Sequence, residues 1–494
     1  AKQTEERVSR FRSPGATDRI HTGDVLWLEK GAQPNDYAQR LSEYLKSETD
    51  LFKSVIVVPP GFINFSLSED FLRRAVAEVL IKGASYGSGH NKKENILVEF
   101  VSANPTGPLT MANGRGGFYG DCLSNVLEKA GYDVTREYYI NDVGNQIRLL
   151  GESIEAAEGK IPDKEEYYKG GYIKNLVGKS ADEAAKILLD EIKTSLSNAR
   201  IEFDSWFSEN EELRTSGAIE DTLKFLEGKN LLETRDGAVW LGDRVLVKSN
   251  GEPTYLLSDL VYHRNKFVER KFDKAITIVG ADHHAEISYV KESVTKFFTI
   301  QPERLHIIVM QLVRLVRGGK EVRMGKRTGE FVTLDELLED VGVDAARYFF
   351  LERSPDTHMD FDLDLAKERS VKNPVYYVQY AHARMCSVFE KAGVGPFTEA
   401  KNLDALQSPH EFSLIKQMIQ FEDVIEDISE DHHVHRLPRY AYELSRAFHN
   451  FYEKERIIGE DKDLMEARLT LVRVAQIVLQ NTLNLMGISA PEKM

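Results

Sequence analysis

A glycine-rich segment, PTGPLTMANGRGG at Pro105–Gly117, is the part of this sequence best suited to holding a ligand by its backbone. It follows ILVEFVS, an apolar run typical of a buried strand, and precedes GFYGDCLSNVL, which has helical spacing. Glycines permit close approach of a backbone, and the first turn of a helix offers unpaired N–H groups and the positive end of a dipole. The segment therefore suits a phosphate group, or it is a glycine-rich turn that serves packing alone.

Basic residues are concentrated in a second glycine-flanked segment, GGKEVRMGKRTG at Gly318–Gly329. A charge run of this kind is by default a solvated turn. No Ser/His/Asp or Cys/His arrangement typical of nucleophilic catalysis stands out in the sequence. Any chemistry is therefore expected to depend on positioning and charge stabilisation rather than on a covalent enzyme intermediate.

Two histidine-containing clusters could suggest a metal site. Asp282, His283 and His284 follow the apolar run AITIVG, but no third ligand has the spacing typical of zinc sites. The cluster Asp431-His432-His433-Val434-His435 is better interpreted as a solvated loop between helices. We therefore expect no protein-bound structural metal.

The elements that must position these segments change character along the chain. Residues 1–90 combine helical spacing with a strand–turn–strand run, which predicts a small α+β domain. Residues 91–368 alternate apolar strands with helices, which predicts an α/β Rossmann-like parallel sheet covered on both faces. The long polar stretch at 151–230 is interpreted as an insertion into that domain. Residues 369–494 show only helix-period segments, which predicts an all-α helical bundle.

Composition sets the broad class of the protein. A chain of 494 residues is too long for one core, and 42% hydrophobic with 29% charged residues is typical of soluble globular proteins. The sequence has no apolar run of about 18 residues, a polar N-terminus unlike a secretory signal, and two cysteines, so we expect a cytoplasmic protein without membrane association. The net charge of −15 argues against general coating of nucleic acid, but not against recognition of one nucleic acid through local patches.

Several long motifs, in order along the chain, resemble the arginyl-tRNA synthetases, a family of class I aminoacyl-tRNA synthetases. They are VEFVSANPTGPL with GRGGFYGDCLSNVLEKAGYDVTREYYINDVGNQI, then SNGEPTYLLSDLVYHRNKF, AITIVGADHHAEI, VRMGKRTGEFVTLDELLEDVGVDAARYFF, RSPDTHMDFDLDLAKERSVKNPVYYVQYAHAR and GISAPEKM. The resemblance covers residues 94–150 and 235–494 strongly, and the insertion and the first 50 residues weakly. It implies ligation of L-arginine to tRNA(Arg) in two steps: ATP-dependent formation of arginyl-adenylate with release of pyrophosphate, then transfer to the 3′-terminal ribose.

The first phosphate signature of the family is altered here. The family's His-X-Gly-His corresponds to Thr110, Met111, Ala112 and Asn113. Thr110 and Asn113 can each donate a neutral hydrogen bond to ATP but cannot carry a positive charge, or they merely cap the following helix. The resemblance also assigns ATP binding to residues around this loop and at the adenosine pocket: Gly107, Pro108, Gly114, Gly116, Asp282, His283 and His284.

The second signature keeps its charge. Arg323-Met324-Gly325-Lys326-Arg327 takes the place of the family's Lys-Met-Ser-Lys-Ser. The resemblance implies that Lys326 meets the β and γ phosphates as pyrophosphate leaves, that Arg323 keeps the charge at the first lysine position, and that Met324 contributes to ATP binding. Because drift after loss of function would have damaged both signatures, we expect an active enzyme that uses ATP with Mg²⁺ as substrate.

The arginine substrate is expected beside a predicted helix. Tyr255 and Asp259 are four residues apart in TYLLSDLVYH and therefore share one helix face. A carboxylate accepts two parallel hydrogen bonds from a guanidinium group, and the resemblance assigns both residues to the arginine side chain. Asn104 would hold the α-amino or carboxylate end by the same resemblance. Asp259 could also be an ordinary surface acid of the helix.

Two regions are expected to bind tRNA. The C-terminal domain of the family reads the anticodon, so Tyr377 and Arg384 in NPVYYVQYAHAR could stack on unpaired bases, although the helical spacing predicts that most of these aromatics are core. The N-terminal domain resembles the one that grips the tRNA elbow, which gives Phe62 a stacking role and Asn64 a role in base-edge hydrogen bonds. Phe62 could equally be a core residue.

We therefore expect an arginine–tRNA ligase that acts as a monomer. Two alternatives stay open: a synthetase-like protein that binds tRNA but cannot activate an amino acid, and a nucleotide-binding α/β enzyme of different chemistry, such as a nucleotidyltransferase. The helical C-terminal region and the Tyr255/Asp259 pair argue against the nucleotidyltransferase.

Overall fold

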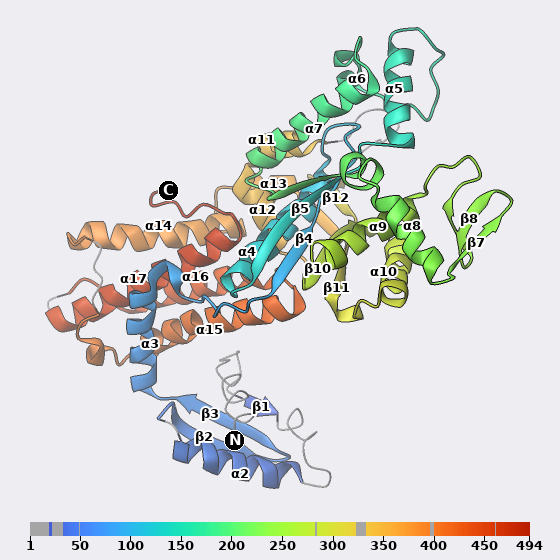
Figure 1. The fold of residues 1–494 in the computed structure, drawn as a ribbon. Helices are drawn as coiled ribbons and strands as arrows, with labels where there is room; N and C mark the ends of the chain where they lie inside the picture. The colour runs from blue at the N-terminus through green and yellow to red at the C-terminus, as the bar shows by residue number, and fades with distance from the viewer. Residues whose placement is uncertain are drawn as a thin grey trace.

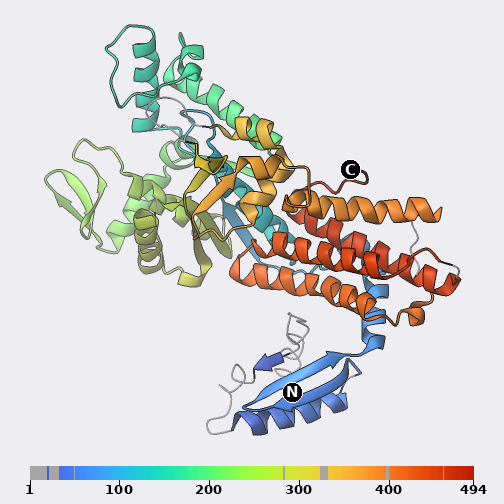
Figure 2. The ribbon, with the colours of Figure 1, turned by 180° about the vertical axis from the view of Figure 1, so that it is seen from behind.

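The computed structural model describes residues 19–21, 33–48, 50–281, 284–322, 332–395, 400–459 and 461–494. Its elements form a small N-terminal unit, a central parallel sheet with helices on both faces, and a C-terminal bundle of long helices (Figures 1 and 2). This arrangement confirms the predicted fold class. Within the described residues, no helix has both the length and the apolar character that crossing a bilayer requires.

The five strands of the central sheet lie in the order β11-β10-β4-β5-β6, and every neighbouring pair is parallel. Their bounds are β4 (Asn95–Glu99), β5 (Asp133–Ile140), β6 (Ser205–Ser208), β10 (Lys274–Gly280) and β11 (Leu305–Met310). The chain runs from β4 outward to β5 and β6, then crosses to β10 on the other side of β4. Ligands of such sheets bind beyond the carboxyl ends of the strands, at the point where the strand order reverses, which here lies between β4 and β10.

Both faces of the sheet are apolar. Successive strand residues point to opposite sides, and the strands carry apolar residues at successive positions. Ile96, Val98 and Ile276 belong to the core shared with α4 (Met111–Lys129) and the C-terminal bundle. Ala275 and Leu305 belong to the core on the other face. That face is covered by α8 (Ala218–Gly228), α9 (Tyr255–Arg264) and α10 (His284–Phe298).

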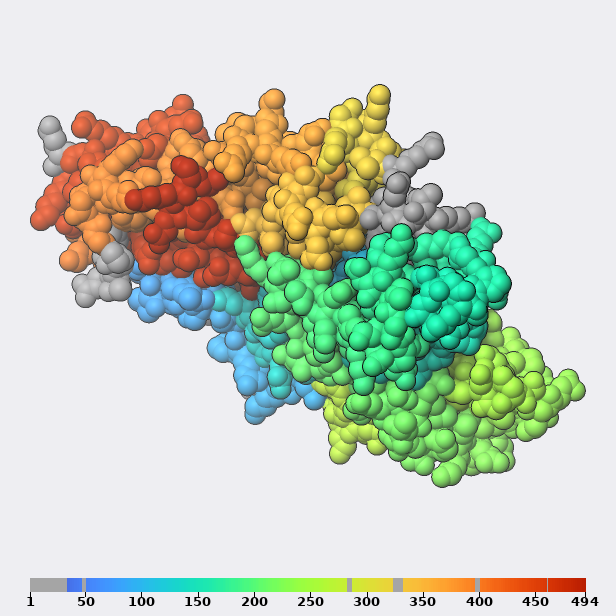
Figure 3. All heavy atoms as spheres, turned by 90° about the horizontal axis from the view of Figure 1, so that it is seen from above, coloured from blue at the N-terminus to red at the C-terminus, as the bar shows by residue number. Residues whose placement is uncertain are grey.

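The predicted insertion forms a separate helical layer. It contains α5 (Asn145–Ala157), α6 (Gly171–Asn175) and α7 (Ala181–Asn198), which share an apolar core of their own. The range 151–230 also contains β6, the edge strand of the central sheet, and α8. Figure 3 shows this layer, coloured teal to green, between the segment around β7–β9 and the segment that contains α11–α13.

Two small sheets accompany the central sheet. An antiparallel sheet consists of β7 (Leu232–Arg235), β8 (Ala238–Leu241) and β9 (Arg244–Val247). A mixed sheet has the order β13-β12-β14, with β12 (Val313–Arg317), β13 (Lys320–Glu321) and β14 (Met359–Asp362). The helices α11 (Leu334–Val341), α12 (Val343–Leu351) and α13 (Leu363–Lys367) lead from this sheet to the bundle.

The bundle consists of α14 (Pro374–Ala392), α15 (Pro409–Asp431), α16 (Arg436–Lys454) and α17 (Lys462–Leu485). The N-terminal unit contains β1 (Arg19–His21), α2 (Pro34–Glu48), β2 (Phe52–Val58) and β3 (Phe62–Leu67), with the sheet order β1-β3-β2. Figure 1 shows this unit apart from the bundle, joined to it by α3 (Glu69–Lys82), which packs on α15 and α17.

Candidate active site

Helix α4 begins beyond the carboxyl end of β4, at the point where the strand order reverses. Its first residue is Met111, whereas the sequence predicted a helix from about Gly117. The reason for the early start is a capping interaction: the Thr110 N–H and hydroxyl both donate to Asn113 Oδ1, at 2.9 and 2.8 Å. Such side-chain caps favour helix initiation at this point.

The side chains of Thr110 and Asn113 therefore do what the capping interpretation predicts. The interaction occupies Asn113 Oδ1 and leaves the amide nitrogen of the same side chain without a hydrogen bond to a described residue. Asn113 is half-buried, and Ala112 beside it is exposed. Asn113 can therefore cap the helix through Oδ1 and still donate a hydrogen bond to an anionic ligand through its amide nitrogen.

The glycines of the segment serve close packing. Gly114 and Gly116 lie inside α4, and a Cβ at Gly114 would approach Leu334 Cδ1 of α11 to 2.7 Å. A Cβ at Gly116 would meet only Ile278 at 4.0 Å, an ordinary contact. Pro108 is half-buried in the loop that precedes the helix. The packing explanation therefore accounts for Gly114.

The residues that follow the basic segment lie at the same helix start. Arg323, Met324 and Lys326 lie outside the described residues. Before them, the Val322 N–H donates to Leu315 O at 2.8 Å. After them, Thr333 forms a β-bridge with Thr110, and the next residue donates its N–H to Leu109 O at 2.9 Å. The chain that leaves the basic segment therefore lies against the N-terminus of α4.

A buried guanidinium holds the first turn of α4 in place. Arg115 is 1% exposed and donates to three carbonyl oxygens, those of Gln311, Ser354 and Thr357, at 2.6 to 2.9 Å. Burial lowers the pKa of Arg115. Sequence reasoning missed this residue, because a charged residue in a helix is expected on the solvated face.

Tyr255 and Asp259 occupy the first and second turns of α9, as predicted. Tyr255 is the first residue of the helix and is 49% exposed, and Asp259 is half-buried. Burial, followed by the negative charges of Glu209 and Asp259, raises the pKa of Tyr139 well above its ordinary value. Asp259 therefore contributes to a negative potential at the carboxyl end of β5.

Two further carboxylates lie at this edge of the sheet and were missed from the sequence. Asp142 follows β5 and accepts hydrogen bonds from Ser208 Oγ at 2.6 Å and the Asn210 N–H at 2.9 Å. Glu209 follows β6 and accepts from Ser258 Oγ at 2.9 Å, next to Asp259 in the chain. Their signal was the position of an acid directly after a strand of a parallel sheet. Arg214 pairs with Glu209 at 2.6 Å and offsets its charge, so Asp142 is the acid of the two that adds negative charge to this edge of the sheet.

Asn104 lies on the loop between β4 and α4, half-buried, and its carbonyl accepts the Thr106 N–H at 2.7 Å. Tyr168 of the insertion connects this loop with α9. Burial raises the pKa of Tyr168, and a hydrogen bond from the Thr106 side chain opposes that rise. The electrostatic interaction with Tyr255 raises the pKa of Tyr168 further, so the two tyrosines lie near each other. The loop residues and the start of α9 therefore approach the same part of the insertion.

The predicted adenosine residues follow β10, the neighbour of β4. Asp282 and His283 lie outside the described residues, and His284 is the first residue of α10. The pairing of β10 with β4 brings the chain after β10 to the edge of the sheet where α4 begins. Among the described residues, no three His, Cys, Asp or Glu side chains are arranged to hold a metal ion.

Phe62 and Asn64 lie on β3, on the sheet face away from α2. The residues between and after them, Ile63 and Phe65, are buried in the core with α2. The register pairs Asn64 with Ile56, which is 58% exposed, and Phe62 with Val58. Phe62 is half-buried and lies outside the core that Ile63 and Phe65 share with α2, so both interpretations of Phe62 stay predictions.

Tyr377 and Arg384 lie on α14, and both are half-buried. The tyrosine ring packs on Tyr442 and His449, each at 5.0 Å between centroids. The guanidinium lies over Tyr380 at 4.6 Å. The prediction that most aromatics of this helix are core is wrong, because its buried positions carry smaller side chains such as Val375, Val378 and Ala381.

The cluster from Asp431 to His435 joins α15 to α16, as predicted, but it is not simply solvated. The His432 ring packs on His306 of β11 at 4.9 Å, and its carbonyl accepts the Tyr119 hydroxyl of α4 at 2.6 Å. Burial lowers the pKa of His432 to about 4. The loop is therefore part of the contact between the bundle and the catalytic region.

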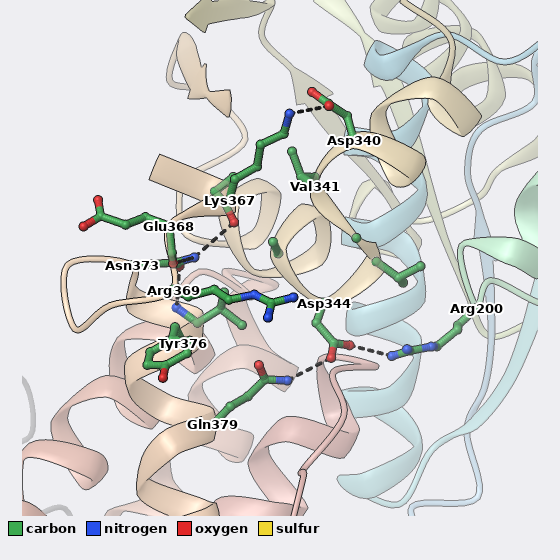
Figure 4. Close-up of a pocket in the computed structure, with 15 residues that line it drawn as sticks. Arg200, Asp340, Val341, Asp344, Lys367, Glu368, Arg369, Asn373, Tyr376 and Gln379 are labelled. Atoms are coloured by element: carbon green, nitrogen blue, oxygen red, sulfur yellow. Dashed lines mark hydrogen bonds and ion pairs between the residues drawn. The ribbon is translucent and has the colours of Figure 1, made fainter. Parts of the chain in front are cut away.

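A cavity of about 500 Å³ lies elsewhere, where α11–α14 meet the end of α7 (Figure 4). Its charged side chains largely neutralise one another: Lys367 pairs with Asp340, and Arg200 pairs with Asp344 at 2.6 Å. It contains none of the predicted ATP or arginine residues. The cavity is therefore not the candidate active site.

Comparisons with known proteins agree with the three regions of the fold. The family described as "tRNA synthetases class I (R), catalytic domain" matches residues 75–169 and 159–387. The family "Arginyl tRNA synthetase N terminal domain" matches residues 25–67, and "DALR anticodon binding domain" matches residues 378–494.

Individual relatives cover nearly the whole chain. An arginine–tRNA ligase of Carboxydothermus hydrogenoformans is 45% identical over 96% of this chain and 92% of its own length. One from Heliobacterium modesticaldum is 44% identical over 95% of this chain and 90% of its own. The solved arginyl-tRNA synthetase of Thermus thermophilus, 22% identical, has the same fold, with a TM-score of 0.77 over 96% of this chain and 94% of its own. The chain belongs to the arginyl-tRNA synthetases, the class I ligases that charge tRNA(Arg) with arginine.

Proposed function

We propose that the chain performs this charging in two steps on the edge of the sheet between β4 and β10. The arginine carboxylate attacks the α-phosphorus of ATP, which gives arginyl-adenylate and releases pyrophosphate. A hydroxyl of the 3′-terminal ribose of tRNA then attacks the adenylate carbonyl and releases AMP. The observation that supports this proposal most is the β-bridge between Thr110 and Thr333, because it brings the chain that follows the basic segment to the start of α4.

The ATP phosphates would lie at the N-terminus of α4. Thr110 and Asn113 replace the positive charge of two histidines with neutral donors, so more of the stabilisation is expected from the helix dipole and from Lys326. Arg323 would assist Lys326. Gly107, Pro108, Gly116 and Met324 would line the nucleotide, Gly114 would allow α4 to pack closely, and Asp282, His283 and His284 would face adenosine.

The arginine side chain would bind at the start of α9. Its guanidinium would donate to the Asp259 carboxylate and pack beside Tyr255, while Asn104 holds the α-amino or carboxylate end. Asp142 supports this assignment, because it adds negative charge to the same sheet edge, whereas Arg214 offsets the charge of Glu209.

Mg²⁺ would arrive with ATP, since this ion prefers phosphate oxygens and water to an all-protein site. The described residues offer no carboxylate cluster for it, so no step is assigned to the ion. Phe62 and Asn64 would contact the tRNA elbow, and Tyr377 and Arg384 the anticodon stem and loop. The domain boundaries 1–90, 91–368 and 369–494, the monomeric state and the cytoplasmic location stay predictions.

Charging of tRNA(Arg) with labelled arginine tests this function. We expect acid-precipitable arginine to accumulate with ATP and tRNA(Arg), and AMP and pyrophosphate to form in equal amounts. Binding of tRNA(Arg) without charging would instead favour the synthetase-like protein that cannot activate an amino acid.

A further inference from the structure

Thr106, on the loop that leads from β4 to α4, is held by Tyr172 of the insertion. It is 8% exposed, and its carbonyl oxygen accepts the hydroxyl of Tyr172 at 3.1 Å. The hydroxyl of Tyr168, a second tyrosine of the insertion, is close enough to the Thr106 side chain to influence the tyrosine's pKa. The insertion therefore holds the backbone of one buried residue of the loop.

Gly107, the next residue, fits directly against Tyr172. A Cβ at Gly107 would lie 3.1 Å from Tyr172 Oη and 3.3 Å from its Cζ, closer than ordinary van der Waals contact. The backbone of Gly107 does not adopt a positive φ, so its conformation does not require glycine. Space for the tyrosine ring is therefore the reason for a glycine at this position.

The two tyrosines are themselves fixed within the insertion. The Tyr168 hydroxyl donates to Gln146 at the start of α5, and its N–H donates to Ser153 Oγ at 2.9 Å. Tyr172 belongs to α6, whose Ile173 is buried in the core of the insertion. Because both tyrosines are held by contacts within the insertion, the insertion can fix the loop rather than follow it.

We propose that Tyr172 is a positioning residue for adenylate formation. Through it the insertion sets the course of Asn104–Gly107, and with it the placement of arginine at Asn104 and of ATP at Gly107 and the start of α4. This inference rests on the proposed function, which assigns those loop residues to the substrates. It gives the insertion a task in catalysis, in addition to any contact with tRNA.

A double-mutant cycle on Gly107 and Tyr172 tests the inference. Kinetics of arginine-dependent pyrophosphate exchange are measured with tRNA(Arg) present. We expect Tyr172→Phe to raise KM for ATP about fivefold, the equivalent of one neutral hydrogen bond. Gly107→Ala should raise it at least as much. In the double variant, KM for ATP should rise by much less than the product of the two single-variant factors, because removal of the Tyr172 hydroxyl relieves its 3.1 Å contact with the added Cβ.

Tyr167→Phe is the matched control. Tyr167 lies in the same segment and is buried, and its ring packs against Lys164 of the insertion, with Nζ 5.3 Å from the ring centroid, rather than against the loop. We expect this variant to keep the wild-type KM for ATP, a constant that a smaller folded fraction does not change. If Gly107→Ala does not fold, the comparison of Tyr172→Phe with Tyr167→Phe decides.

Equal values of KM for ATP in Tyr172→Phe and Tyr167→Phe would overturn the inference, as would fully multiplicative effects in the cycle. Either result with an active wild-type enzyme leaves the proposed function intact. Absence of exchange in the wild-type enzyme would instead refute the proposed function, on which this inference depends.

Discussion

Replacement of Asn113 by Asp separates the two roles that this side chain could have. In the structure, Asn113 Oδ1 accepts from the N–H and the hydroxyl of Thr110. An aspartate keeps this acceptor, so the cap survives. The substitution replaces only the amide nitrogen, which is the group proposed to face ATP, with a negatively charged oxygen.

The expected magnitudes differ widely between the two roles. For stability, an acid in the first turn of a helix is favourable by roughly 0.3–1 kcal/mol, so the melting temperature should not fall. For activity, two like charges about 4 Å apart repel by about 4 kcal/mol at an effective dielectric constant of about 20. If Asn113 faces phosphate, kcat/KM for ATP should therefore fall about a thousandfold.

The assay is pyrophosphate exchange as a function of ATP concentration, paired with thermal unfolding of the same preparation. Asn113→Ala is the companion variant, which loses both the cap and the donor and should cost about 1 kcal/mol of stability. The reasoning is refuted if Asn113→Asp keeps near-normal kcat/KM for ATP, because the residue would then serve only as a cap.

Four further results are expected. Lys326→Ala should depress adenylate formation far more than arginine binding, and equal losses in exchange rate and in arginine affinity by calorimetry would rule out a role on the departing phosphates. Asp259→Asn should raise KM for arginine roughly 10- to 100-fold, since a charge-assisted hydrogen bond contributes about 1.5–3 kcal/mol; an unchanged KM would make this acid an ordinary surface residue. Arg347→Met should lower the free energy of unfolding in urea by about 3–5 kcal/mol, because it strands a buried carboxylate; a loss below about 1 kcal/mol would contradict this. Burial, then the charge of Lys266, lowers the pKa of His263 to about 3. Below about pH 6.5 the unfolded chain therefore binds a proton at this histidine that the folded chain does not, and the free energy of unfolding should fall between about pH 6.5 and pH 3. The melting temperature of His263→Asn should depend less on pH over this range, and an equal dependence in the variant and the wild type would contradict the prediction.

The order of elements and the position of the main segments could be predicted from the sequence. Apolar strand runs alternating with helices indicated the parallel sheet, and the glycine-rich segment does follow β4 and contain the start of α4. Tyr255 and Asp259 occupy successive turns of α9, because helical periodicity is a local property that a sequence displays directly.

Contacts between distant segments could not be predicted. Arg347 is fully buried, where it pairs with Asp121 of α4 at 2.8 Å and donates to the Ala199 carbonyl after α7 and the Met486 carbonyl after α17. A composition-based rule expects arginine at the surface, and only the tertiary arrangement supplies the partners that permit its burial. The same holds for Tyr172, whose partner Thr106 is 66 residues away in the sequence.

The most direct test of the two-step account uses tRNA(Arg) whose 3′-terminal ribose has been oxidised with periodate, so that it binds but cannot accept arginine. With this tRNA, ATP and labelled pyrophosphate, the account predicts that charging stops while arginine-dependent exchange of pyrophosphate into ATP continues. Absence of exchange with both oxidised and intact tRNA(Arg), in an enzyme preparation that binds both, would contradict it.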